Sequence, residues 1–261
     1  MLIPTVSNII FIAIVGLIMG SFINATAGRW GTTRQNTSRS KCFYCGTILQ
    51  WISLVPVLSW LYQRGRCRDC YSRLPLRYPL IEFVTAGLFA GALYISTSII
   101  GLLFNVILFT ILVFIALIDV DQYIIPHEFS IGLALLSFST LFFDYSTLNA
   151  IYPTFIDVMA GPILALFYWV LWLLTRGRGM GFADGTLALS VGWLLGLWSG
   201  IVATVFAFWV GTAVSLGIIL YQKIFSKPNT MSMKSAVPFG PFIIIGFLIV
   251  YVLDLSILIF V

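Results

Sequence analysis

Charged residues are scarce in this chain of 261 residues. They make up 9% of it, hydrophobic residues make up 60%, and the mean hydropathy is +1.05. Such a composition excludes an ordinary water-soluble domain, because too few polar side chains remain to cover its surface. We therefore expect an all-α polytopic membrane protein.

Histidine is rarer still, since the chain contains only one, His127. An HExxH zinc protease needs two histidines on one helix face, so this class is excluded. A Ser-His-Asp triad is disfavoured as well, because no motif places a serine or cysteine nucleophile beside His127. Cysteine is limited to four residues, and all four lie in one polar segment.

The chain also lacks the basic start of a cleavable signal peptide, so its first apolar run is interpreted as a spanning helix that remains. Stretches of roughly 20 apolar residues predict about eight membrane-spanning helices. They cover residues 5–27, 79–98, 101–118, 127–143, 153–174, 184–197, 199–222 and 238–260. The sixth is short, and it could instead be one half of a broken or re-entrant pair with the seventh.

Positive charges are missing from every second loop. If the N-terminus is outside, the outward turns contain no lysine or arginine, and all 14 lie in the inward loops. Those loops are residues 28–78, 119–126, 175–183 and 223–237. Basic residues stay on the cytosolic side of a membrane, so loop 28–78 is predicted to be cytosolic. The net charge of +5 then reflects orientation and anionic lipid headgroups, and we expect no nucleic-acid partner.

The cysteines form two CxxC pairs in this loop, CFYC (Cys42 and Cys45) and CRDC (Cys67 and Cys70), with 21 residues between them. This spacing is typical of a tetrahedral zinc site with four thiolates, and closed sites of this kind are structural. Paired disulfides are the alternative, which a reducing cytosol disfavours. We predict a zinc ion that staples the loop into a small domain. The predicted divisions of the chain are 1–27, 28–78 and 79–261.

Two carboxylates, Asp119 and Asp121, follow an apolar run without charges. Residues two apart point about 200° apart on a helix, so these two cannot face each other if the helix continues. Asp184 closes the next inward loop and offers a partner at the same membrane edge. Two carboxylates in a partly dehydrated site share a proton, so one acts as an acid while the other activates water. The predicted catalytic pair is therefore Asp119 and Asp184.

Structural roles compete with these assignments. Asp184 at a helix start among glycines is a natural N-cap. Asp119 is harder to explain structurally, because a negative charge near a helix C-terminus opposes the helix dipole. Asp121 could simply be the residue that begins the turn before Pro126.

Four residues are predicted to bind substrate: Asp121, Glu82, Gly181 and Gly185. Glu82 in RYPLIE could equally be an ordinary carboxylate near a helix N-terminus, and spacing does not decide. Gly181 and Gly185 frame Asp184 and would let an extended peptide approach closely, although linker flexibility explains them too.

Four motifs together resemble the prepilin peptidases, which are membrane aspartic proteases. They are GSFIN, the twin-CxxC loop closing with RYPLIE, ALIDVDQYIIP and GMGFADGTLAL, in that order between about residues 20 and 195. The resemblance implies an enzyme of the bacterial inner membrane that removes the short basic leader of type IV prepilins or pseudopilins at the cytosolic face, after a glycine. In many members it also implies N-methylation of the new N-terminus with S-adenosylmethionine. The family's catalytic aspartates correspond to Asp119 and Asp184.

Three positions depart from the family pattern. Ala183 replaces the second glycine of G-x-G-D, Thr186 replaces the lysine two residues after the aspartate, and His127 replaces an acid after the proline. Alanine restricts the backbone only mildly, so proteolysis is still expected. Loss of the lysine removes a positive charge from the neighbourhood of the pair.

Two other functional classes remain as alternatives. A proton-coupled transporter would also use acids in membrane helices, but no clear internal repeat is present and the charges lie near the membrane faces. A membrane adaptor that binds partners through residues 28–78 would not need Asp119 or Asp184.

Overall fold

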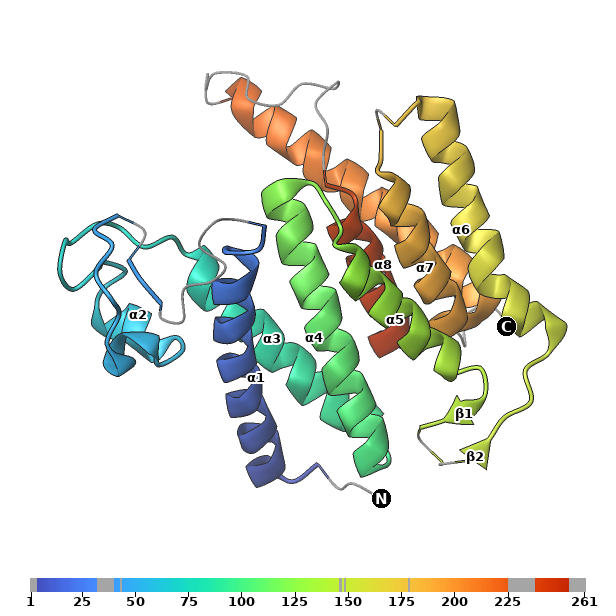
Figure 1. Cartoon of the computed structure of the whole chain (residues 1–261), viewed down its shortest axis with the longest axis horizontal. Helices are drawn as coiled ribbons and strands as arrows, with labels where there is room; N and C mark the ends of the chain where they lie inside the picture. Colours follow the sequence, from blue (N-terminus) through green and yellow to red (C-terminus); the bar gives the residue numbers. More distant parts are fainter. Residues whose placement is uncertain are drawn as a thin grey trace. The chain divides into compact units, whose positions relative to one another are not determined.

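The computed structural model is mostly helical, and its elements are labelled in Figure 1. It describes residues 4–31, 40–42, 44–145, 147, 149–177, 179–224 and 238–253. The chain divides into two compact units, Met1–Phe114 and Ile115–Val261, and helix α4 (Ile99–Gln122) runs through the division. The predicted domain boundaries at residues 28 and 79 stay predictions.

In the first unit, helix α1 (Val6–Ala27) packs along α3 (Arg77–Ile95) through two glycines one turn apart. A Cβ atom on Gly16 would lie 2.7 Å from the Cα of Ala86, and one on Gly20 would lie 2.9 Å from the Cα of Glu82. The two backbones can approach this closely only because the glycines have no side chain.

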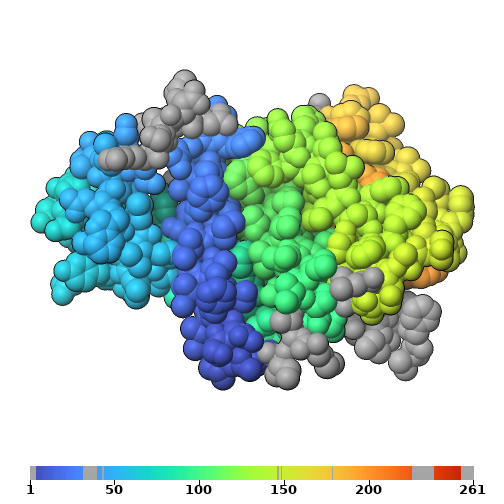
Figure 2. All heavy atoms as spheres, turned by 60° about the horizontal axis from the view of Figure 1, so that its bottom comes forward, coloured from blue at the N-terminus to red at the C-terminus, as the bar shows by residue number. Residues whose placement is uncertain are grey.

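The other face of α1 is uncovered from end to end, as Figure 2 shows. Large apolar side chains lie along it at a spacing of about one turn, and at least half of each is exposed. They are Val6, Ile10, Ile14, Ile18 and Phe22. Such a face is typical of a helix that contacts lipid.

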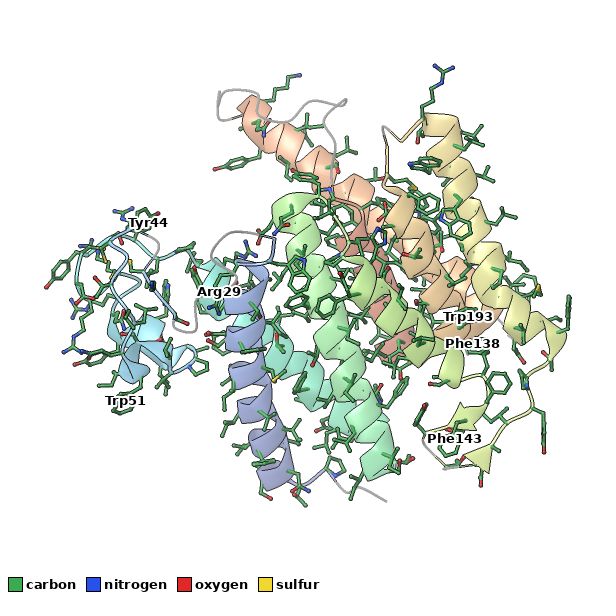
Figure 3. All side chains as sticks on the ribbon, viewed as in Figure 1. Arg29, Tyr44, Trp51, Phe138, Phe143 and Trp193 are labelled. Carbon is green, nitrogen blue, oxygen red and sulfur yellow. The ribbon has the colours of Figure 1, made fainter. Side chains whose placement is uncertain are left out.

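Between α1 and α3 the described chain forms turns and two short helices, η1 (Trp51–Leu54) and α2 (Leu58–Tyr62). Figure 3 shows Tyr44 and Trp51 on opposite sides of this segment, and Arg29 in the turn that follows α1. The side chains of Tyr44 and Trp51 are largely exposed, at 67% and 75%. The segment therefore has little apolar core of its own and depends on other links to hold its shape.

The second unit is built around α7 (Phe182–Ile224), which packs against α5 (His127–Ser139), α6 (Phe155–Thr175) and α8 (Gly240–Leu253). The strands β1 (Phe143–Asp144) and β2 (Asn149–Ala150) pair antiparallel between α5 and α6.

Close contacts and aromatic rings fix these helices. A Cβ atom on Gly192 of α7 would lie 2.6 Å from the Cα of Gly161 on α6. Figure 3 shows Phe138 of α5 beside Trp193 of α7, with ring centroids 5.0 Å apart. The carboxylate of Asp157 and the hydroxyl of Thr154 form a capping box that begins α6.

Helix α7 turns back on itself at Gly196. Its 43 residues far exceed one membrane crossing, and Gly196 has a non-helical backbone with φ 77° and ψ 177°. A Cβ atom on Gly200 would lie 3.7 Å from the Cα of Gly192, whereas eight residues of straight helix would separate them by roughly 12 Å. The turn falls where the sixth and seventh predicted helices meet, and both halves are visible in Figure 1.

Among the described residues, five helices are long and apolar enough to cross a membrane: α1, α3, α4, α6 and α7. Helix α5, with 13 residues, and the described part of α8, with 14, are shorter. These findings confirm the all-α, multi-pass membrane fold. The count of eight spans stays a prediction.

Candidate functional site: two buried aspartates and a four-cysteine cluster

Asp119 and Asp184 lie in the same compact unit, on α4 and α7, and both are almost completely buried. Their side chains are 5% and 3% exposed. They are near enough for the charge of Asp119 to act on Asp184. The structure therefore brings together two carboxylates that are 65 positions apart in the chain, in surroundings from which water is largely removed.

The end of α4 separates Asp119 from Asp121. The helix continues to Gln122, so the loop predicted to begin at residue 119 begins later. Asp119 faces inward, whereas Asp121 is exposed, as the 200° offset requires. The backbone N–H of Gly240, at the start of α8, donates to Asp119 Oδ2 at 3.0 Å. Asp119 is thus held by a residue far away in the sequence.

Asp184 lies in the first turn of α7, and its Oδ2 accepts the backbone N–H of Gly181 at 2.8 Å. This is half of a capping box, so Asp184 is not the N-cap residue itself. Asp157 caps α6 through Thr154 in the same manner, but it is only partly buried. Capping needs no deep burial, so capping alone does not account for the position of Asp184.

Aromatic rings cover the chain beside Asp184. The rings of Trp169 and Phe182 stack with centroids 5.5 Å apart, and the Trp169 indole N–H donates to the Phe182 carbonyl at 3.2 Å. Trp172 meets the edge of Phe182. A Cβ atom on Gly185 would clash with the indole of Trp169, so this glycine is required for packing.

Tyr168 and Gly240 are site residues that the sequence reasoning did not find. Tyr168 is 1% exposed, and the charge of Asp184 acts on it. Its hydroxyl lies near Thr204, but it forms no hydrogen bond with any residue that the structure describes. Tyr168 sits within an apolar run that offers no signal. Gly240 lies in the sequence PFGPF, which follows a polar loop. This pattern predicts the start of a helix, but it does not predict that Gly240 contacts Asp119.

The four cysteines of the first unit gather into one cluster. All four sulfur atoms lie within 4.8 Å of one another, and Cys42 Sγ is 3.9 Å from Cys70 Sγ. Sulfurs at the corners of a zinc tetrahedron are separated by about 3.8 Å, whereas a disulfide needs about 2.05 Å. All four cysteines are free. Their arrangement fits a metal ion, and no disulfide joins any of the four.

The two CxxC turns are built alike. In each, the N–H of the first cysteine bonds to the carbonyl five residues later, and a left-handed residue follows the second cysteine: Gly46 with φ 72° and Tyr71 with φ 55°. Cys45 and Cys70 each have a hydroxyl within 3.2 Å, from Thr47 and Ser72. Two equivalent knuckles facing each other are the usual frame of a four-thiolate site.

Backbone donors in the knuckles prepare these thiols to bind a cation. Burial raises the pKa of Cys42, but the N–H groups of Cys45 and Tyr44, together with the sulfurs of Cys45 and Cys67, outweigh it and lower the value to about 6. The N–H of Cys70 lowers the pKa of Cys67, but burial and the sulfur of Cys42 raise it to about 11. The ionisation of Cys42 and that of Cys67 are therefore linked, and a bound divalent cation would stabilise both side chains as thiolates.

Two family models match the chain on either side of residue 100. The Bacterial Peptidase A24 N-terminal domain matches residues 14–96, and the Type IV leader peptidase family matches residues 106–216. The prepilin leader peptidase/N-methyltransferase of Bacillus subtilis (strain 168) is 30% identical over 248 residues, which cover 95% of both chains. This chain belongs to the type IV leader peptidase family.

Other relatives carry the same name. That of Aeromonas hydrophila is 32% identical over 210 residues, 80% of this chain and 69% of the relative. That of Burkholderia pseudomallei (strain K96243) is 31% identical over 273 residues, 93% of this chain and 84% of the relative. No solved structure matches the chain.

The three departures from the leader peptidase pattern lie in different local surroundings. Thr186, in place of the lysine, exchanges a hydrogen bond of 2.7 Å with Ser130 and so joins α7 to α5. His127 is exposed at the start of α5. Ala183 lies in the first turn of α7, where alanine is a good helix former.

The structure places the residues predicted to bind substrate in different settings. Gly181 and Asp121 are exposed, whereas Gly185 is buried. Glu82 lies in the first unit, is 6% exposed and accepts the N–H of Val57 at 2.7 Å. It thereby joins α3 to the start of α2. A substrate contact by any of the four stays a prediction.

Proposed function

We propose that this chain is a membrane aspartic endopeptidase that removes the leader of type IV prepilins or pseudopilins, with Asp119 and Asp184 as its catalytic pair. The observation that carries the proposal is the burial of both carboxylates in one unit, each with one oxygen held by a backbone N–H. The names of the relatives supply the substrate class.

The pair can run peptide hydrolysis without a nucleophilic side chain. With one proton between them, the ionised carboxylate takes a proton from a water molecule, whose oxygen attacks the peptide carbonyl carbon. The protonated carboxyl gives its proton to the carbonyl oxygen. When the tetrahedral intermediate collapses, the carboxyl that took a proton from water gives it to the nitrogen, and the other carboxylate takes a proton back from an oxygen of the intermediate. The C–N bond breaks, which releases the leader with a new carboxyl group and the pilin with a new N-terminal amine, and one proton again lies between the two aspartates.

Zinc bound by Cys42, Cys45, Cys67 and Cys70 would supply structure only, because four thiolates leave no position for water. The relatives' names favour a second activity, in which S-adenosylmethionine supplies a methyl group to the new N-terminal amine. The transporter and adaptor alternatives are not favoured, since neither accounts for membership of a peptidase family.

The distribution of lysine and arginine favours an N-terminus outside, and the cysteine cluster and both aspartates at the cytosolic face of the inner membrane. Prepilin and the lipid bilayer are then the partners. Reporter fusions at the predicted outward turn near residue 99 and within the cysteine loop test this orientation, and a periplasmic signal from the cysteine loop would contradict it.

Mass spectrometry of a pilin N-terminus tests both activities together. The pilin precursor is expressed with and without this chain, in cells that have no other leader peptidase. We expect loss of the leader only when the chain is present, together with the mass of one methyl group if the second activity operates. An intact leader in its presence would refute the peptidase assignment.

A further inference from the structure

Gly240, the first residue of α8, lies outside the regions that the family models match, yet it contacts Asp119. Those regions are residues 14–96 and 106–216. The hydrogen bond from Gly240 N–H to Asp119 Oδ2 spans 121 sequence positions and is buried. The helix that follows the second matched region therefore reaches the aspartate pair.

Glycine at this position is explained by space and not by backbone conformation. Gly240 does not have a left-handed φ, so other residues could adopt its backbone angles. A Cβ atom here, however, would lie 2.7 Å from Asp119 Oδ2 and 3.3 Å from its Cγ. Any side chain would push the carboxylate away from the N–H that holds it.

The start of α8 suits an acceptor of this kind. The first N–H groups of a helix have no partner inside the helix, and they form its positive end. Phe239 fixes this start, because its ring lies 5.0 Å from Phe208 and 6.2 Å from Tyr168 between centroids. The Gly240 N–H is thus aimed at Asp119 from a rigid support.

We propose that Gly240 is a positioning residue of the peptidase, a role that rests on the proposed function. Its N–H holds one oxygen of Asp119 and leaves the other to meet water or substrate. Gly181 does the same for Asp184 at 2.8 Å. Among the described residues no other hydrogen bond reaches either carboxylate. Each member of the pair is therefore oriented by one glycine N–H at a helix start.

The variant Gly240→Ala tests this role. We expect kcat for prepilin cleavage to fall at least about tenfold, because small misplacements of a reacting group are costly, while KM and Tm stay near the wild-type values. Gly217→Ala is the matched control, since nothing lies within 4 Å of its added Cβ atom, and it should cleave normally.

A second control separates positioning from packing. Gly246→Ala, in the same helix, would clash with the Ala203 carbonyl and should lower Tm while kcat per folded molecule is kept. Wild-type kcat in Gly240→Ala, or a loss that only follows the amount of folded enzyme, would overturn the positioning role. Wild-type enzyme that fails to cleave in the same assay would instead refute the proposed function.

Hydrogen exchange tests the same contact without substrate and without altering Gly240. We expect the Gly240 amide to exchange at least about tenfold faster in Asp119→Ala than in the wild type, because it loses its acceptor. Asp121→Ala, two residues away on the exposed side, should leave the exchange unchanged. Equal protection of the Gly240 amide in the wild type and in Asp119→Ala would overturn the proposal.

Discussion

The two compact units gather their reactive side chains by different means. In the first, two short turns bring four sulfurs together through local hydrogen bonds, within a segment that has little apolar core. In the second, packed helices bring Asp119 and Asp184 together, and backbone N–H groups at helix starts orient them. We therefore expect the cysteine cluster to depend on a bound metal ion for its stability, whereas the aspartate pair is held in place by packed helices.

The largest effect is expected from removing either aspartate. Asp119→Asn and Asp184→Asn should each lower prepilin cleavage by roughly a thousandfold or more. In each variant only one carboxyl group remains, so the pair can no longer both donate and accept a proton. The helices that hold the pair should stay folded, with nearly unchanged Tm in detergent. Cleavage is measured by mass spectrometry of the pilin product.

Asp121→Asn is the matched control, since it makes the same change on the exposed side of α4. It should keep at least partial activity. Complete loss of activity in Asp121→Asn together with normal activity in Asp119→Asn would show that Asp121, and not Asp119, acts with Asp184.

Removing a metal ligand should affect the first unit instead. Purified protein is expected to contain about one zinc ion per chain, and Cys67→Ser should lose it. Because the segment then lacks its staple, protease should cut between residues 40 and 76 far faster than in the wild type. Metal analysis and timed proteolysis measure both effects.

Ser72→Ala removes only the hydroxyl beside Cys70 and should keep the metal. A cysteine variant that has lost zinc but resists protease as well as the wild type would show that the segment is stable without a staple. The contrast between the two units would then be wrong.

The smallest effect is expected from the contact of α1 with α3. Gly20→Ala adds a Cβ atom 2.9 Å from the Cα of Glu82 and should destabilise the first unit by about 1–3 kcal/mol. Gly91→Ala on α3 meets nothing within 4 Å and should be neutral. Thermal unfolding in detergent distinguishes them, and equal Tm values would show that α1 and α3 do not depend on this contact.

Sequence reasoning succeeded where the signal was local. The CxxC spacing located the cysteine cluster, and helical geometry separated Asp119 from Asp121. Helix ends were predicted less accurately: the loop expected to begin at residue 119 begins after Gln122, so Asp119 lies inside α4.

The missed contacts depend on tertiary structure. The bond from Gly240 to Asp119 joins positions 121 residues apart, and no spacing rule covers such a distance. Glu82 illustrates the same limit, since its link to Val57 follows from how a turn folds over α3.

The turn at Gly196 has a consequence for the surrounding bilayer. The part of α7 that precedes it rises only roughly 20 Å, and its neighbour α5, with 13 residues, is about as long. The hydrocarbon layer of a membrane is about 30 Å thick, so lipid beside this pair of helices must thin or admit water at their ends. The first turn of α7 would then lie close to water at a depth that acyl chains occupy elsewhere, so the buried side chain of Asp184 would be separated from water by only a short distance.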